Sequence, residues 1–375
     1  MKITSIDVVR TKKPIPLPGE YCPAWEQPDG APVNGFGVAY YRIFTDEGIV
    51  GYGPYGAEPD EYVRRCLIGK DPFKTETFWT SAMAGLETRS RGSYGGLDVA
   101  LWDIIGKAAN RPVYQLLGTR ADKIKVYAAT SRILTAEEHI EQVLHVMSLG
   151  FKAVKLRLHR PDWRDDIKTI EAVRKACGDE ITIVVDANQN NRSTEYGYWS
   201  KETARLVCRE MQALGVFFCE EPLKRRDYEG LSSLSKEFDM YIAGGEHAQN
   251  IYEFKEHLKY STYDILQPDL LIGDIGITGL RKLGYIAEYH DKQIVPHVCG
   301  MGSFAISFAA SAAAMVGLSN CPMLEYSYDP PFMTVESLQF FIKEKFTVDC
   351  DGYVHMPQTA GIGIEIDEAA LAEYL

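Results

Sequence analysis

A run of β-branched residues is the most strongly patterned stretch of the chain. It lies within ITIVVDANQNN, at positions 181–191, and its apolar part, 181–185, has the composition of a strand buried on both faces of a parallel sheet. The run ends at Asp186. A carboxylate at the end of a buried strand is costly unless a cation, hydrogen bonds or solvent compensate its charge. Taken alone, this residue fits a helix cap equally well.

Seven other segments after position 123 share this pattern, and amphipathic stretches separate them. One such stretch, WRDDIKTIEAVRKACG, closes at Gly178, a typical helix C-cap. The alternation predicts an α/β fold, a (β/α)7β modified TIM barrel. An open doubly wound sheet is the alternative, but no Gly-rich phosphate loop follows the first strand. The predicted strands span 125–130, 153–159, 181–188, 216–222, 240–246, 264–269, 293–298 and 323–327.

The two ends of the chain have a different pattern. Residues 2–10 and 37–45 alternate as antiparallel strands do, and 61–117 has helical periodicity. We therefore predict an α+β capping domain over 1–122, the barrel over 123–347, and a C-terminal segment, 348–375, that packs on the capping domain. Within the first unit, 14–34 holds six prolines, which predicts an irregular loop; Tyr21 and Trp25 favour a lid over a flexible linker.

Composition narrows the classes of partner. The 375 residues carry a formal net charge of −12, which argues against nucleic acid but leaves a small anionic substrate possible beside a bound cation. No run of about 18 uncharged apolar residues appears, so no membrane span is expected. The start lacks the apolar core of a signal peptide, and the eight cysteines form no CxxC pair. These features predict a cytoplasmic protein with reduced thiols.

Ionisable residues end seven consecutive predicted strands. The active sites of β/α barrels lie at the C-terminal ends of the strands, so these side chains are expected around one mouth. A single acid there is easily explained as a cap, whereas a ring of charged groups indicates a site. The residues are Lys155 and Arg157, Asp186 and Asn188, Glu220 and Glu221, Glu246 and His247, Asp269, His297, and Glu325.

Three of the acids suit a metal ion. Asp186, Glu220 and Glu246 end successive strands and offer oxygen ligands that converge on one point. Three carboxylates supply about half of an octahedral shell, with room for water and substrate, which is how Mg²⁺ is usually held. Zinc would favour histidine or cysteine ligands, so Mg²⁺ is the predicted cofactor.

The remaining charged groups predict proton transfer next to a carboxylate. Lys155 and Arg157 share one face of their strand and suit the binding of a carboxylate and the stabilisation of an enolate. His297 and Asp269 end neighbouring strands; an Asp that orients one imidazole nitrogen leaves the other as a general base. Glu325 could bond a substrate oxygen if it is protonated.

The sequence resembles the enolase superfamily, in its mandelate racemase subgroup. The resemblance rests on GGLDVALWDIIGKAANRPVYQLLG, KLR, VVDANQ, CEEP, GGEH, PDLLIGDIGITG, VPH, LEY and DGYVHMPQTAGIGIEID, which together cover nearly the whole chain. Sites of this superfamily combine a Lys or His base with Mg²⁺. The resemblance implies Mg²⁺ ligands at 186, 220 and 246, the 269–297 dyad, a helper role for 325, and homo-oligomers. It also implies that 14–34 is a specificity loop.

One departure from the family pattern affects the predicted reaction. Racemases of the family carry KxK, with the second Lys as a base, whereas this chain has Lys155-Leu156-Arg157. A guanidinium is a poor base, so one clear base, His297, remains. A β-elimination needs only one base, which favours dehydration of an acid sugar to a 2-keto-3-deoxy acid. A shifted register would make Lys155 the second base.

Other functions stay open at this point. They are a racemase or epimerase, a cycloisomerase acting on a lactone or anhydro sugar acid, and a catalytically silent sugar-acid-binding protein. The expected partner is a small carboxylate substrate, a sugar acid. Asn188, Tyr21 and Trp25 are the predicted substrate-binding residues.

Overall fold

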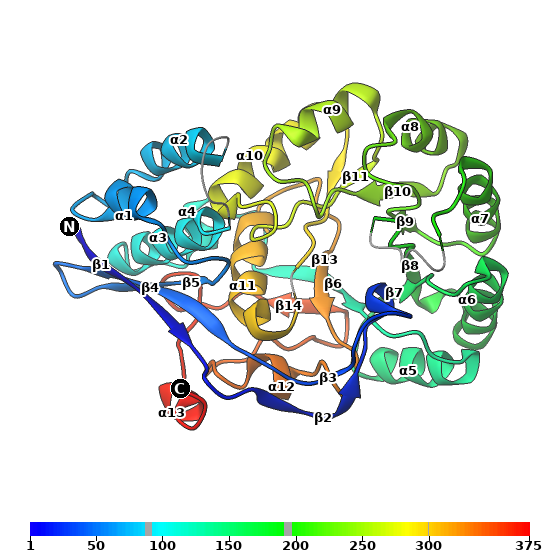
Figure 1. Ribbon diagram of the computed structural model, residues 1–375, viewed down its shortest axis with the longest axis horizontal. Helices are drawn as coiled ribbons and strands as arrows, with labels where there is room; N and C mark the ends of the chain where they lie inside the picture. Colours follow the sequence, from blue (N-terminus) through cyan, green and yellow to red (C-terminus); the bar gives the residue numbers. More distant parts are fainter. Residues whose placement is uncertain (87–91, 191–196, 299) are drawn as a thin grey trace.

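Eight parallel strands form the centre of the computed structural model, which describes residues 1–86, 92–190, 197–298 and 300–375 (Figure 1). Hydrogen-bonded neighbours follow the order β12-β11-β10-β9-β8-β7-β6-β13. The first of these strands along the chain, β6, therefore pairs with the last, β13, and the sheet curls on itself. The strands are β6 (Lys123–Ala129), β7 (Ala153–Arg157), β8 (Thr182–Asp186), β9 (Phe218–Glu220), β10 (Tyr241–Gly244), β11 (Ile265–Leu266), β12 (Gln293–Ile294) and β13 (Leu324–Ser327).

Seven helices connect these eight strands, as the (β/α)7β prediction requires. Helices α5 to α9 make an outer layer on the right of Figure 1, whereas α10 and α11 lie between the strands and the N-terminal unit. A capping box at Thr135 begins the first helix, and Gly178 ends the second with φ of +67°, as predicted. The helices are α5 (Ala136–Ser148), α6 (Trp163–Cys177), α7 (Lys201–Ala213), α8 (Tyr228–Glu237), α9 (Glu253–Tyr260), α10 (Gly276–Tyr289) and α11 (Phe304–Met315).

The later barrel strands are shorter than predicted, for a local reason. Pro268 and Pro296 have no N–H to donate, and β11 and β12 end two residues before them, at Leu266 and Ile294. In β9 the ladder ends at Glu220, because Glu221 takes a left-handed backbone conformation with φ of +47°. Asp269 and His297 therefore lie just beyond their strands, whereas Glu220 is the last residue of β9.

The N-terminal unit combines a small antiparallel sheet with helices. Its strands are paired in the order β1-β4-β5, and the observed bounds agree with the predicted strands at 2–10 and 37–45. Short helices occupy most of the region predicted to be helical. The elements are β1 (Ile3–Arg10), β4 (Ala39–Thr45), β5 (Val50–Pro54), α1 (Glu61–Leu67), α2 (Thr75–Leu86), α3 (Tyr94–Ala108) and α4 (Val113–Leu116).

The prediction that 14–34 has no regular structure is wrong. Two strands, β2 (Ile15–Tyr21) and β3 (Val33–Phe36), pair as an antiparallel ribbon, with the short 3₁₀ helix η1 (Ala24–Glu26) between them. Prolines are tolerated because each strand of a two-stranded ribbon has a free edge, where a missing N–H costs no ladder bond. Six prolines argue against a strand in the interior of a sheet, but they do not exclude an isolated two-stranded ribbon.

Helix α3 holds the N-terminal unit against the barrel. Asp98 accepts hydrogen bonds from the backbone N–H of Thr278 at 2.9 Å and from its hydroxyl at 2.7 Å, at the start of α10. Burial raises the pKa of Asp98 to about 7. A Cβ at Gly95 would lie 2.1 Å from the carbonyl oxygen of Leu270, so only glycine permits this close approach.

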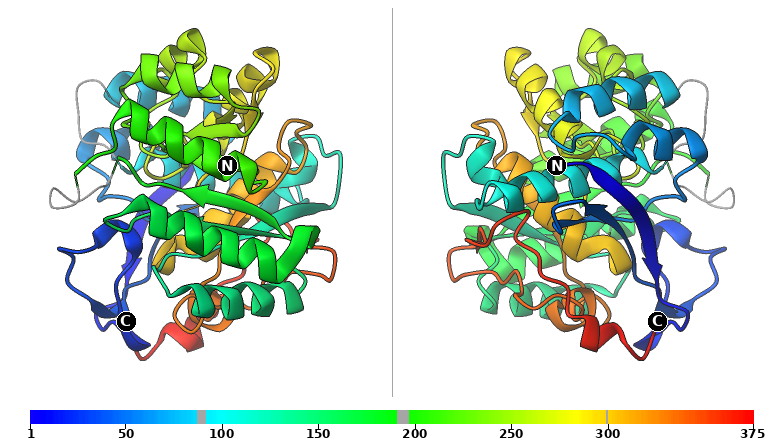
Figure 2. Two further views of the ribbon diagram at one scale, coloured as in Figure 1. Left: turned by 90° about the vertical axis from the view of Figure 1, so that its right-hand side faces the viewer. Right: turned by 90° about the vertical axis from the view of Figure 1, so that its left-hand side faces the viewer.

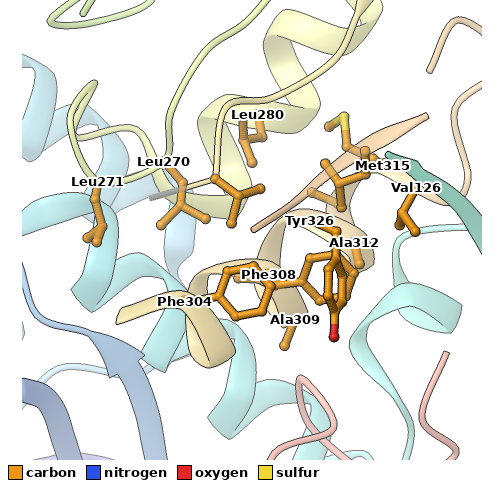
Figure 3. Close-up of a cluster of buried hydrophobic side chains, with 14 of the residues drawn as sticks. Val126, Leu270, Leu271, Leu280, Phe304, Phe308, Ala309, Ala312, Met315 and Tyr326 are labelled. Carbon is orange, nitrogen blue, oxygen red and sulfur yellow. The ribbon is translucent and has the colours of Figure 1, made fainter. Parts of the chain in front are cut away.

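An aromatic cluster fixes the eighth strand (Figure 3). Tyr326 packs between Phe304 and Phe308 of α11, at ring-centroid distances of 5.2 and 5.1 Å. Successive residues of a strand point to opposite faces. Because Tyr326 faces the helix, its neighbour Glu325 faces the barrel interior, where the site lies.

The C-terminal segment contacts both units. Strand β14 (Tyr353–His355) pairs with β6, the backbone N–H of Ile362 donates to Asp103 of α3, and the carbonyl of Tyr374 accepts from Lys12. Figure 2 shows this red segment beside the blue N-terminal strands. The segment also forms α13 (Glu368–Leu371), and α12 (Val335–Gln339) precedes it. We propose domain boundaries near 122 and 347.

Within the described residues, no helix has the length and apolar character needed to span a bilayer.

Candidate active site

Three carboxylates meet at the ends of adjacent strands. Asp186 is the last residue of β8 and Glu220 the last of β9, and the two are paired in the ladder. Glu246 follows β10 by two residues. One ligand oxygen from each of the three lies within 4.8 Å of the others. The strand ends thus bring together the acids that the sequence predicted as metal ligands.

The electrostatics of this cluster fit a divalent cation. The three side chains are buried, and Glu220 Oε1 has no hydrogen-bond partner in the described part of the chain. Burial, followed by the charge of Asp186, raises the pKa of Glu220 to about 8. Such a buried oxygen beside a like charge is stable only with a proton or a cation. Oxygen donors of this kind suit a hard cation such as Mg²⁺.

Lys155 lies beneath the cavity rather than on its surface. Its Nζ is 2.6 Å from Glu325 Oε1 and 3.0 Å from Glu220 Oε2, and the side chain is fully buried. Burial alone would lower the pKa of Lys155, but these two carboxylates outweigh it and the pKa is raised. The ammonium therefore stays charged and paired.

Arg157 lines the cavity and is fixed on several sides. It shares the inward face of β7 with Lys155, as predicted, and pairs in the ladder with Asp186. Its guanidinium donates to the carboxylate of Asp186, to the carbonyl of Thr130 at 2.9 Å and to Asn188 Oδ1 at 3.3 Å. Arg157, not Lys155, therefore faces the cavity.

His297 and Asp269 form the predicted dyad. His297 Nδ1 is 2.7 Å from Asp269 Oδ2, and the other carboxylate oxygen accepts from the backbone N–H groups of Leu271 and Ile272 at 2.6 and 2.8 Å. With the carboxylate fixed as an acceptor, Nδ1 carries the proton and Nε2 is left facing Glu246 Oε2 at 3.4 Å. The geometry provides an oriented imidazole at the cavity edge.

Carboxylates around the imidazole set its charge. Burial would lower the pKa of His297, but Glu246, Glu325 and Asp269 outweigh it and hold the pKa well above the usual range. Burial alone would raise the pKa of Glu246, yet His297 and His247 hold it below the usual range. Positive and negative groups thus alternate around the mouth.

Glu325 is surrounded by donors. Its Oε1 faces Lys155, and its Oε2 accepts from the backbone N–H of Val298 at 3.1 Å. Burial would raise the pKa of Glu325, but Lys155 and His297 outweigh it and lower the pKa. This environment favours a carboxylate and gives no support to the protonated form that a donor role would need.

A cavity of about 530 Å³ joins these groups to the N-terminal ribbon. Tyr21, Trp25 and Asn188, the predicted substrate-binding residues, all line it. The Trp25 ring lies 4.8 Å from the Arg157 guanidinium carbon. The cavity also exposes Arg157, Glu246, His297 and Glu325, whereas Asp186, Glu220, Lys155 and Asp269 lie behind its surface.

Sequence reasoning missed the residues that anchor the ribbon. The Tyr21 hydroxyl donates to Ser131 Oγ at 2.7 Å, and the backbone N–H of Ala24 donates to the Ser131 carbonyl at 2.7 Å. Ser131 in turn donates to the buried carboxylate of Asp329, which also pairs with Arg132 at 2.8 Å. An Asp followed by two prolines directly after the eighth strand was the one available signal.

The comparisons place this architecture among known proteins. Residues 34–118 match the N-terminal domain of mandelate racemase / muconate lactonizing enzyme, and 138–370 match the enolase C-terminal domain-like family. The chain is 29% identical to the arabinonate dehydratase of Saccharolobus solfataricus over 89% of each sequence. It is also 29% identical to the D-galactarolactone cycloisomerase of Agrobacterium fabrum, over 89% of this chain and 90% of that one.

A solved structure shows the same fold over the full length. The L-talarate dehydratase of Polaromonas sp. JS666, crystallised with Mg and L-glucarate, superposes with a TM-score of 0.81 at 26% identity, over 99% of this chain and 96% of that one. The fold and site define a barrel enzyme with a carboxylate metal centre. The chain belongs to the enolase superfamily, in its mandelate racemase / muconate lactonizing enzyme subgroup.

Proposed function

We propose that this chain is a Mg²⁺-dependent acid-sugar dehydratase. It removes the proton α to the substrate carboxylate and eliminates the β-hydroxyl, which gives a 2-keto-3-deoxy acid and water. The proposed metal ligands are Asp186, Glu220 and Glu246, whose oxygens approach one another within 4.8 Å. Related dehydratases of acid sugars, and the Mg-containing complex of one of them, support this assignment.

His297 is the proposed general base. The charge of Glu246, the group that raises the pKa of His297 most, would be offset by bound Mg²⁺. Nε2 then takes the α-proton while Asp269 holds the Nδ1 proton at 2.7 Å. The imidazolium then returns a proton to the departing β-hydroxyl, which leaves as water. The enol that remains becomes the keto acid. Bound Mg²⁺ would polarise the substrate carboxylate and stabilise the charge that develops as the α-proton leaves.

Two cations assist this step from the opposite side. Arg157 reaches the cavity and is proposed to bind and stabilise the enolate oxygens, because a guanidinium stays protonated at working pH. Lys155 is proposed to hold the carboxylates of Glu220 and Glu325 in place from below, at 3.0 and 2.6 Å. Neither is proposed as a base.

Dehydration is favoured over racemisation because a base occupies only one of the two catalytic positions. Inversion of a stereocentre normally uses a base on each face of the substrate, and here the second position holds Arg157. Among the described residues, two imidazoles line the cavity, but Nε2 of His247 lies 2.9 Å from Glu246, a proposed metal ligand, whereas Asp269 holds only Nδ1 of the proposed base, His297. Elimination needs that one base alone.

A cycloisomerase is the second candidate, because the relative from Agrobacterium fabrum has that activity and similar coverage. It would convert a lactone without net loss of water, so the absence of keto acid among the products would identify it. A racemase would put solvent deuterium into both epimers. A silent binding protein would have no use for the oriented dyad.

The decisive test replaces the base. With Mg²⁺ and a panel of aldonic and aldaric acids, the wild-type protein should form a 2-keto-3-deoxy acid. His297→Asn should abolish keto-acid formation and α-proton exchange in D₂O, while Mg²⁺ still binds. The matched control is His290→Asn, the same change at an exposed position, which should behave as wild type. Full activity of His297→Asn would refute the assignment.

The substrate is a small carboxylate, a sugar acid; nucleic acid and membrane are not expected partners. A homo-oligomer and a cytoplasmic location are also proposed.

A further inference from the structure

The cavity has two walls of different chemistry. The strand-end wall presents charged and polar groups, among them Arg157, Asn188 and His297. The opposite wall is made by the N-terminal ribbon and by loops after the last strands, and most of its side chains are apolar. Its apolar members are Pro23, Trp25, Ala31, Val33, Met301 and Met333.

Three ribbon side chains that line the cavity carry polar atoms. The Tyr21 hydroxyl hydrogen is given to Ser131 Oγ, and the Trp25 ring covers Arg157. Glu26, at the exposed side of the ribbon, adds a carboxylate to the lining. A hydroxyl placed against the apolar members of this wall would lose its hydrogen bonds to water, whereas one at the exposed side could reach the Glu26 carboxylate; a second carboxylate would meet a like charge there.

Two apolar residues of the wall have an unfavourable solvent exposure or an unfavourable backbone conformation. Val33 keeps 44% of its surface exposed beside the cavity. Met301 has φ of +50°, a left-handed conformation that is strained for a residue with a Cβ and that recurs at ligand sites. An apolar part of a ligand would shield both.

We infer that the cavity selects monocarboxylic acid sugars whose far end is a methyl group, that is, ω-deoxy sugar acids. This inference rests on the proposed function, which places the carboxylate at the strand-end wall and so directs the far end of the substrate to the ribbon. A terminal hydroxyl would lose its hydrogen bonds to water there. A hydrophobic pocket disfavours such an added hydroxyl by about 10- to 100-fold in kcat/KM.

A dicarboxylic sugar acid is the competing substrate class. Lys224, Arg225 and Arg226 line a neighbouring hollow of about 510 Å³ that shares His247 with the cavity, and they could receive a distal carboxylate. Two of them already have partners. Arg225 donates to the carbonyl of His247, and Lys224 Nζ lies 3.8 Å above the Tyr198 ring. The observations therefore favour the apolar end.

The test compares three substrates that differ only at the terminal carbon. In each configurational series, kcat/KM for keto-acid formation is measured with the aldonate, its ω-deoxy analogue and the corresponding aldarate. We expect the ω-deoxy acid to exceed the aldonate by about 10-fold or more, and the aldarate by about 100-fold or more. Preference for the aldonate or the aldarate in the series turned over best would overturn the inference.

Failure of the proposed function gives a different result. If none of the three is turned over, that function fails, while the order of binding affinities, measured by calorimetry with Mg²⁺ present, still tests the wall. Val33→Thr adds a hydroxyl to the wall at nearly constant volume and should narrow the preference several-fold. Val9→Thr, on β1 and outside the cavity lining, should leave the ratio unchanged. An unchanged ratio in Val33→Thr would also contradict the inference.

Discussion

The two walls of the cavity are built by different means. The charged groups at the strand ends come from successive strands, and the ladder fixes neighbours such as Asp186 and Glu220 side by side. The ribbon wall is held by hydrogen bonds of Tyr21 and Ala24 with Ser131 and by packing of Tyr21 against Phe332. In the proposed function, reactivity belongs to the part that the ladder fixes, and selectivity to the part that individual side-chain contacts hold.

The free-energy cost of a substitution should also differ between the two walls, because one is charged and the other is mostly apolar. Removing one member of a buried ionic cluster leaves the others uncompensated, which costs several kcal/mol. Removing one neutral hydrogen bond costs only about 1 kcal/mol. Substitutions at the strand ends should therefore have far larger effects than those at the ribbon, and the following predictions test that order.

The largest effect is expected from Glu220→Gln. The change removes one charge from the proposed ligand set and one partner of Lys155, which lies 3.0 Å away. We expect kcat/KM to fall by about 10³-fold and Mg²⁺ affinity, measured by calorimetry, to fall with it. The neighbouring Glu221→Gln is the matched control, because Glu221 bonds Asn190 and lies outside the three-carboxylate cluster. Equal losses in both variants would contradict the ligand assignment.

A smaller effect is expected from Arg157→Lys. Lysine keeps the positive charge but cannot reach Thr130, Asp186 and Asn188 together, as the guanidinium does. Loss of such charge-assisted bonds should lower kcat/KM for dehydration by about 10- to 100-fold. Complete loss of dehydration, with Mg²⁺ binding intact, would instead make Arg157 indispensable to the chemical step.

The strand-end wall is also the part that the sequence made predictable. A strand end is a local property: a β-branched run followed by Asp186, or a CEEP motif, marks its position without knowledge of the fold. Eight such runs predicted the barrel, and the dyad followed from two neighbouring ends. The places of Pro268 and Pro296 explain why β11 and β12 are shorter than expected.

The ribbon wall could not be predicted in the same way. Its anchor joins Tyr21 to Ser131, 110 positions later, and Ser131 to Asp329, 198 positions later again. No pattern of hydrophobic positions encodes such a contact. The prolines at 16 and 18 also concealed the pairing of β2 with β3, since proline opposes sheet interiors but not free edges.

A pH effect tests the buried contacts next to the anchor, where His139 Nδ1 lies 3.3 Å from Gln142 and Gln142 donates to Asp329 at 2.7 Å. His139 is buried, its Nε2 accepts from the backbone N–H of Leu134 at 3.3 Å, and burial, with Arg160 next, lowers its pKa to about 4. The unfolded chain binds this proton near pH 6.5, so stability falls as pH drops from 6.5 toward 4. Between pH 7 and 5 the expected loss from this residue is about 2 kcal/mol.

Denaturant unfolding at the two pH values checks this loss. The fall in unfolding free energy between pH 7 and 5 should be smaller in His139→Gln than in the wild type, by that amount. His257, whose pKa is also lowered to about 4 by burial, lies on α9 and provides a matched comparison. An unchanged pH dependence in His139→Gln would show that this imidazole is not buried in its neutral form.

The smallest effect concerns the anchor itself. Tyr21→Phe removes the hydroxyl that donates to Ser131 but keeps the backbone bond from Ala24. We expect KM to rise about 5-fold with kcat little changed, because one hydrogen bond of about 1 kcal/mol is lost from the wall and none from the strand ends. Ser131→Ala also removes the bond to Asp329, so its effect should be at least as large, and adding Tyr21→Phe to it should change nothing further. Additive effects, or a fall in kcat instead of a rise in KM, would show that the ribbon takes part in the reaction and that the two walls do not divide it as proposed.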